Sequence, residues 1–114
     1  MSEGSEKIRV LRKRPGEAPE MISIDNSMEA FRAEVGGEVV FVTPLSDVRI
    51  VKKMCSRVDE LPRNVVWCGV DLRGVILVVG CNLRKGTYHD LPVPEFWADS
   101  LIRQEVRESE GPNT

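Results

Sequence analysis

The chain has 114 residues, which is enough for one domain with a single modest core, and its 41% hydrophobic and 30% charged residues are typical of a globular protein. The longest apolar stretch, Gly74 to Cys81, is far shorter than the roughly 20 residues of a membrane-spanning helix, and no apolar segment of signal-peptide type follows the polar N-terminus. We therefore expect a cytoplasmic protein with no membrane contact, and the net charge of −2 argues against the global basic field of duplex-DNA-binding proteins.

The N-terminal segment predicts a β-hairpin that follows a disordered polar lead over residues 1–6. Ile8 and Val10 alternate with charged residues, which is the period of a half-buried strand. Residues 15–19 contain two prolines and a glycine and indicate a turn, and residues 20–24 return to strand composition.

A helix is predicted next, because the apolar period changes. Met28, Phe31 and Val35 fall at positions i, i+3 and i+7, so they share one helix face. Either Asn26 or Ser27 can cap the start of this helix with its side-chain oxygen.

The adjacent glycines Gly36 and Gly37 end this helix and precede a β-branched strand that Pro44 terminates. Phosphate-binding glycine loops have the opposite order, in which a strand leads through glycines into a helix N-terminus. We therefore assign Gly36 and Gly37 a structural role, in which one of them takes the left-handed conformation that commonly ends a helix.

The middle of the chain predicts further strands. Residues 47–54 alternate between apolar and charged side chains, and a polar connection containing Pro62 follows. Residues 65–73 fit either a strand or a loop. Residues 75–80 form the most apolar strand, which we place at the centre of the sheet, and residues 82–94 predict a loop or short hairpin.

The C-terminal segment predicts a helix whose Trp97, Leu101 and Ile102 face the core. The predicted order is β-β-α-β-β-(β)-β-α, which defines an α+β domain over residues 7–107, with a mostly antiparallel sheet of about five strands and two helices. Residues 108–114 are predicted to be a frayed tail.

The cysteines and the single histidine do not form a known reactive pattern. Cys55, Cys68 and Cys81 are thirteen positions apart, whereas common zinc sites pair ligands as C-x₂₋₄-C, so the spacing predicts reduced thiols and no metal or other cofactor. His89 has no nucleophile motif such as G-x-S-x-G beside it. We expect a protein that is not an enzyme, and a small enzyme using His89 or a cysteine stays open as an alternative.

The basic run near the N-terminus supports a second alternative, nucleic-acid binding through Arg9, Arg12, Lys13 and Arg14. No aromatic residue interleaves with the run to stack on bases. Charges on an edge strand also prevent unwanted strand pairing, and this simpler explanation is favoured.

Several segments occur in a recognisable order: the hairpin, "SIDNSMEAFRAEVGGEVVFV", an L-P-x-N segment (Leu61, Pro62 and Asn64), "GVILVVG", and a short helix near "DLPVPEF". From about Ile8 to about Arg103 the chain resembles an uncharacterised family of small proteins, a domain of unknown function common in bacteriophages and mobile elements of Gram-positive bacteria. The resemblance marks a divergent member, and it implies an accessory role such as counter-defence, with no catalytic residue.

The leading hypothesis is therefore a non-enzymatic accessory binding protein that occupies a host protein or sequesters a small anionic ligand. Arg63 and Asn64, placed in a polar loop, are the candidate ligand-binding residues, since a guanidinium and an amide suit an anionic ligand. The structural alternative is that Asn64 makes turn hydrogen bonds and that Arg63 is solvated. Self-association as a homodimer also stays open.

Overall fold

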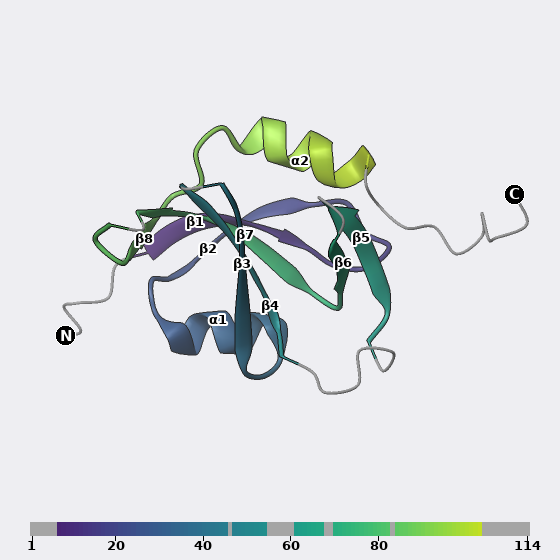
Figure 1. The fold of residues 1–114 in the computed structure, drawn as a ribbon, viewed down its shortest axis with the longest axis horizontal. Helices are drawn as coiled ribbons and strands as arrows, with labels where there is room; N and C mark the ends of the chain where they lie inside the picture. The colour runs from purple at the N-terminus through teal and green to yellow at the C-terminus, as the bar shows by residue number, and fades with distance from the viewer. Residues whose placement is uncertain (1–6, 46, 55–60, 68–69, 83, 104–114) are drawn as a thin grey trace, which may run out of the picture.

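The computed structural model describes residues 7–45, 47–54, 61–67, 70–82 and 84–103 (Figure 1). The predicted α+β class with two helices is confirmed, and the described residues contain eight strands instead of about five. In chain order the elements are β1 (Lys7–Lys13), β2 (Glu20–Asp25), α1 (Met28–Val35), β3 (Val39–Leu45), β4 (Val48–Lys53), β5 (Arg63–Trp67), β6 (Val70–Arg73), β7 (Ile76–Asn82), β8 (Thr87–His89) and α2 (Pro94–Arg103). The predicted lead and tail lie outside the described residues.

The main sheet has the strand order β2-β1-β7-β4-β3, and every pair in it is antiparallel. The apolar strand β7 is central, as predicted. One edge of β7 pairs with β4, and the other pairs first with β1 and then, from Gly80 onward, with β8. Six of the seven β7 residues are buried, because both faces of the sheet are covered at this strand.

Two hydrophobic clusters form the core, one on each face of the sheet. The two helices lie on opposite faces (Figure 1). Helix α1 covers one face with Phe31 and Val35, which pack against β1, β4 and β7. Helix α2 and the β5–β6 hairpin cover the other face, where Trp97 packs edge-to-face on Trp67 with ring centroids 5.0 Å apart. The alternation of strand side chains between the two faces explains why Val51 and Ile50 belong to different clusters.

The predicted ends of α1 are confirmed. Ser27 is the N-cap, with its Oγ accepting a hydrogen bond from the Ala30 N–H at 3.1 Å. Gly36 is left-handed at φ 88°, and the N–H groups of Gly36 and Gly37 donate to the Arg32 carbonyl at 2.8 and 3.1 Å.

One residue on each predicted helix face lies outside the core, and the prediction that Ile102 faces the core is wrong. Met28 is 36% exposed at the first position of α1, and Ile102 is 48% exposed on α2 beside the buried Leu101. In both helices the residues three to four positions apart, Phe31 with Val35 and Trp97 with Leu101, make the buried stripe.

The segment around residue 64 differs most from the prediction. Arg63 and Asn64 begin strand β5 instead of lying in a polar loop, and residues 65–73, which fitted either a strand or a loop, contribute to both strands of the β5–β6 hairpin. Relative to β6 the register shifts by one residue between Arg63 and Val65, so Asn64 is the extra residue of a β-bulge. The bulge turns Asn64 inward beside the buried Val65.

Strand β3 was predicted to end before Pro44, and it continues through Pro44 to Leu45. β3 lies at an edge of the sheet, where a missing N–H group is tolerated, and its register against β4 shifts between Val42 and Leu45.

Candidate functional site

The predicted ligand-binding residues Arg63 and Asn64 have separate surroundings. Asn64 is fully buried, and its Oδ1 accepts a hydrogen bond from Lys13 Nζ at 3.0 Å. Its Nδ2 donates to the carbonyl oxygens of Lys13 and Gly74, each at 2.8 Å. The two bonds to Lys13 join the β5–β6 hairpin to β1, and the bond to Gly74 holds the end of β6, so Asn64 is a structural residue. The exposed Arg63 lies 3.6 Å from the Asp71 carboxylate.

The predicted nucleic-acid-binding residues do not form one surface. Lys13 is fully buried and donates to the Arg14 carbonyl at 2.9 Å as well as to Asn64. Arg14 lies 3.6 Å from Glu17, within its own turn. Arg9 is exposed, and its backbone N–H donates to the Asp90 carboxylate.

Arg12 is occupied by two carboxylates from neighbouring elements. Its guanidinium contacts Glu20 on β2 and Glu34 on α1, both at 2.7 Å. The hydrogen bond from Arg12 lowers the pKa of the Glu20 carboxyl, and the bonds to Glu20 and Glu34 raise the pKa of Arg12. The charge of Arg12 therefore ties β1 to β2 and α1.

His89 and Cys81 lie close together in the sheet but make no reactive pair. His89 is exposed on β8, with Nδ1 2.9 Å from the Asp90 carbonyl oxygen, and its ring lies over Gly80, where an added Cβ would come within 2.6 Å of it. Cys81 is buried, and burial raises the pKa of its thiol. Cys55 and Cys68 lie outside the described residues, and within those residues no three His, Cys, Asp or Glu side chains could hold a metal ion.

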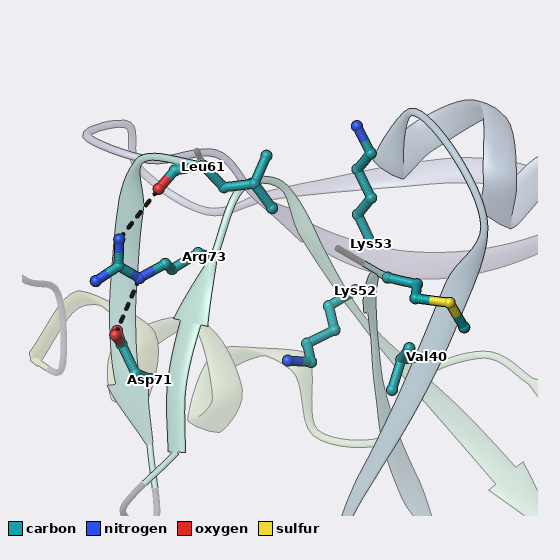
Figure 2. A pocket seen from close by; sticks show the side chains of 7 residues that line it. Val40, Lys52, Lys53, Leu61, Asp71 and Arg73 are labelled. Carbon is teal, nitrogen blue, oxygen red and sulfur yellow. Dashed lines mark hydrogen bonds and ion pairs between the residues drawn. The ribbon is translucent and has the colours of Figure 1, made fainter. Parts of the chain in front are cut away.

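A cleft opens instead between the end of β4 and the β5–β6 hairpin (Figure 2). It encloses about 130 Å³ and is lined by Val40, Lys52, Lys53, Met54, Leu61, Asp71 and Arg73. The lining contains three cationic side chains and one carboxylate, so its formal charge is +2.

The two sides of the cleft differ in whether their charged side chains have partners. On the hairpin side, Arg73 Nε donates to Asp71 Oδ2 at 3.0 Å and its Nη1 donates to the Leu61 carbonyl at 3.3 Å. Arg63 shares the Asp71 carboxylate, which is thus fully engaged by guanidinium groups.

On the β4 side, Lys52 extends toward the hairpin, whereas Lys53 points the other way, with its Cε carbon beside Gly37 (Figure 2). Within the described parts of the chain, no carboxylate lies within ion-pair distance of either ammonium group. Lys52 therefore supplies uncompensated positive charge inside the cleft, and Lys53 adds positive charge at its rim.

The sequence held a weak signal for this cleft that the prediction missed. Two adjacent lysines, Lys52 and Lys53, lie near the end of the strand predicted over residues 47–54. Asp71 and Arg73 are two positions apart, so in a strand their side chains lie on the same face. The signal could not be used without knowing that residues 70–73 form a strand beside the lysines.

The comparisons with known proteins identify the family. Residues 8–101 match the family described as a domain of unknown function (DUF3846). The chain belongs to this family. The match runs from β1 into α2, so the DUF3846 domain includes all the described strands and both helices, and the resemblance to an uncharacterised family is confirmed. No curated protein and no solved structure matches the chain. Among the described helices of this DUF3846 protein, none has the length and apolar character to cross a membrane.

Proposed function

We propose that this DUF3846 protein is a non-enzymatic binding protein that captures a phosphate group of a small ligand in the cleft between β4 and the β5–β6 hairpin. The observation that carries the proposal is Lys52, whose side chain extends into the cleft toward the hairpin without a carboxylate partner among the described residues, while Lys53 adds its positive charge at the rim. A bound phosphate would give the Lys52 ammonium group an anionic hydrogen-bond acceptor.

The wall opposite the lysines supports an anionic ligand of limited size. Arg73 is held in place by Asp71 and by the Leu61 carbonyl, so the wall is built before any ligand arrives. The volume of about 130 Å³ is below the roughly 300–1,000 Å³ of sites that enclose a whole small molecule. The cleft therefore suits one anionic group, with the remainder of the ligand outside it.

A stoichiometric binder also agrees with the accessory role in a phage or mobile element that the family resemblance implies. Such a protein needs a rigid scaffold and a charged recess. The sheet, covered on both faces, supplies the scaffold, and the cleft at the end of β4 supplies the charged recess. This reasoning extends the hypothesis of ligand capture and moves its site from Arg63 and Asn64 to Lys52 and Lys53.

Thermal unfolding at low salt with inorganic phosphate and with nucleoside mono- and diphosphates tests the proposal. A ligand at 100 times its Kd should stabilise the fold by about 2.7 kcal/mol, a shift of several degrees in Tm. The double variant Lys52→Gln/Lys53→Gln should lose this shift. The matched control is Lys85→Gln, which removes an exposed lysine from the turn between β7 and β8 and should keep the shift.

Two results would contradict the proposal. One is the absence of any stabilisation at about 10 mM of every phosphate compound, since even millimolar affinity would be visible there. The other is an equal shift in the wild type and in the double variant, which would place the anion elsewhere.

A further inference from the structure

Strand β3 forms an edge of the main sheet, and within the described residues it pairs only with β4. The direction of its backbone groups follows from one hydrogen bond, in which the Met54 N–H donates to the Glu38 carbonyl at 2.7 Å. This bond makes Glu38 and Met54 a hydrogen-bonded pair, so the next such pair is Val40 with Lys52. The N–H and C=O groups of Val39 and Phe41 therefore point away from β4, toward the free edge.

This edge lacks the usual protection against strand pairing. Natural edge strands are commonly blunted by charged side chains, by proline or by bulges. β3 has no charged residue from Val39 to Leu45, and its bulge and Pro44 come after the outward-facing groups of Val39 and Phe41. The opposite edge strand, β2, has charged residues at both ends, where Glu20 and Asp25 pair with cations of β1.

We propose that the β3 edge binds a second copy of this chain, with the two β3 strands antiparallel about a two-fold axis and the two sheets joined into one. With the axis at Phe41, antiparallel pairing of identical strands sets Phe41 against Phe41 and Val40 against Val42, with Val39 opposite Thr43 and no like charges opposed.

Charge complementarity favours a second copy over an unrelated strand. Glu38 precedes β3, and its side chain is 69% exposed, in a surface ion pair with Arg32 Nε at 3.3 Å. Arg49 lies beside the other end of the strand, with Nε 3.3 Å from Thr43 Oγ1, its guanidinium carbon 4.9 Å from the centre of the Phe41 ring, and Nη1 donating to the Tyr88 hydroxyl at 2.8 Å. In an antiparallel pair the Val39 end of one copy meets the Thr43 end of the other. The acidic end of each β3, with Glu38, is therefore brought beside the basic Arg49 end of the second copy, and the two-fold axis makes this complementarity occur twice.

Sedimentation velocity of the full chain over a range of protein concentrations tests the inference. The wild type should sediment increasingly as a dimer as concentration rises, and added salt should weaken the dimer. Val39→Pro removes one outward-facing N–H and leaves the hydrogen bonds to β4 in place, so it should give a folded monomer. Glu38→Arg should raise the dimer dissociation constant at least tenfold, while Glu29→Arg, the same charge change on the first turn of α1, should leave it unchanged.

A wild type that stays monomeric at every concentration overturns the inference, and so does a dimer that survives both Val39→Pro and Glu38→Arg. If Val39→Pro does not fold, Glu38→Arg against Glu29→Arg decides the question alone. The inference is independent of the phosphate cleft, because Lys52→Gln/Lys53→Gln should abolish phosphate binding and keep the dimer.

Discussion

The substitution Asn64→Ala tests whether the buried amide holds the β5–β6 hairpin on the sheet. It removes the acceptor of Lys13 Nζ and the donor of the Lys13 and Gly74 carbonyls. A hydrogen bond to a charged group is worth about 1.5–3 kcal/mol, and a buried carbonyl left without its donor costs about 1–3 kcal/mol. Because Lys13 Nζ keeps the Arg14 carbonyl, we expect the free energy of unfolding to fall by about 3–5 kcal/mol, a large part of the 5–15 kcal/mol typical of a domain.

Urea unfolding followed by tryptophan fluorescence measures this loss, since Trp67 and Trp97 are in contact and buried in the cluster that the hairpin covers. With a slope of about 2 kcal/mol per molar, the midpoint should fall by about 2 M without a change in slope. The matched control is Asn82→Ala, which removes a side-chain acceptor of the Lys85 N–H in an exposed turn and should cost about 1 kcal/mol or less.

A loss for Asn64→Ala no larger than for Asn82→Ala would refute the structural role of Asn64. A double-mutant cycle with Lys13→Met and Asn64→Leu gives a second reading. We expect a coupling energy of about 1–3 kcal/mol. Each single variant leaves one buried polar group without its partner, whereas the double variant removes both groups of the pair.

Three further predictions follow from contacts and pKa shifts elsewhere in the fold. Gly80→Ala should lower the free energy of unfolding by more than about 2 kcal/mol, since its Cβ would lie 2.5 Å from the Asp90 carbonyl oxygen. Gly37→Ala should lower it by less than about 1 kcal/mol, because its Cβ would lie 3.0 Å from the flexible end of the Lys53 side chain. Thermal unfolding measures both losses, and equal losses would contradict this reasoning. The folded pKa of Glu20 lies below its ordinary value of 4.5, so the stability it contributes is present above that value and is lost as pH falls through the folded pKa. Urea unfolding at a series of acid pH values should show this loss in the wild type and a weaker one in Glu20→Gln, and identical profiles would argue against it. Burial raises the pKa of the Cys81 thiol, so Cys81 should resist maleimide at neutral pH in the folded protein and react with it in urea. Peptide mass mapping identifies the labelled cysteine, and fast labelling of Cys81 in the folded protein would show that its thiol is accessible.

The features that sequence predicted correctly are those that local rules govern. The end of α1 depends on the left-handed conformation of Gly36, and an adjacent helix and strand are enough to indicate it. The central position of β7 follows from its continuous apolar run, because only a strand covered on both faces needs one. Both signals lie within about ten residues of the chain.

The features that sequence missed depend on distant partners. Lys13 and Asn64 are 51 positions apart, and only the bulge at Asn64 turns its amide inward to meet the lysine. Arg12 looks like part of a basic surface until β2 and α1 bring two carboxylates to it. The sequence shows the positions of the charged residues, but only the fold shows which of them lie beside an opposite charge.

The proposed phosphate cleft and the proposed dimer edge both involve strand β3, the cleft through a side chain and the edge through backbone groups. The side chain of Val40 lines the cleft while its backbone groups face β4, and the neighbouring Val39 and Phe41 direct their backbone groups to the edge. The two-fold axis of a continuous antiparallel sheet is perpendicular to the sheet, so both clefts would open on one face, opposite α1. Each cleft is complete within one copy, because its lysines and its hairpin wall come from the same chain. We therefore expect monomeric Val39→Pro to keep the phosphate-dependent stabilisation. Its loss together with the dimer would mean that one ligand spans both copies.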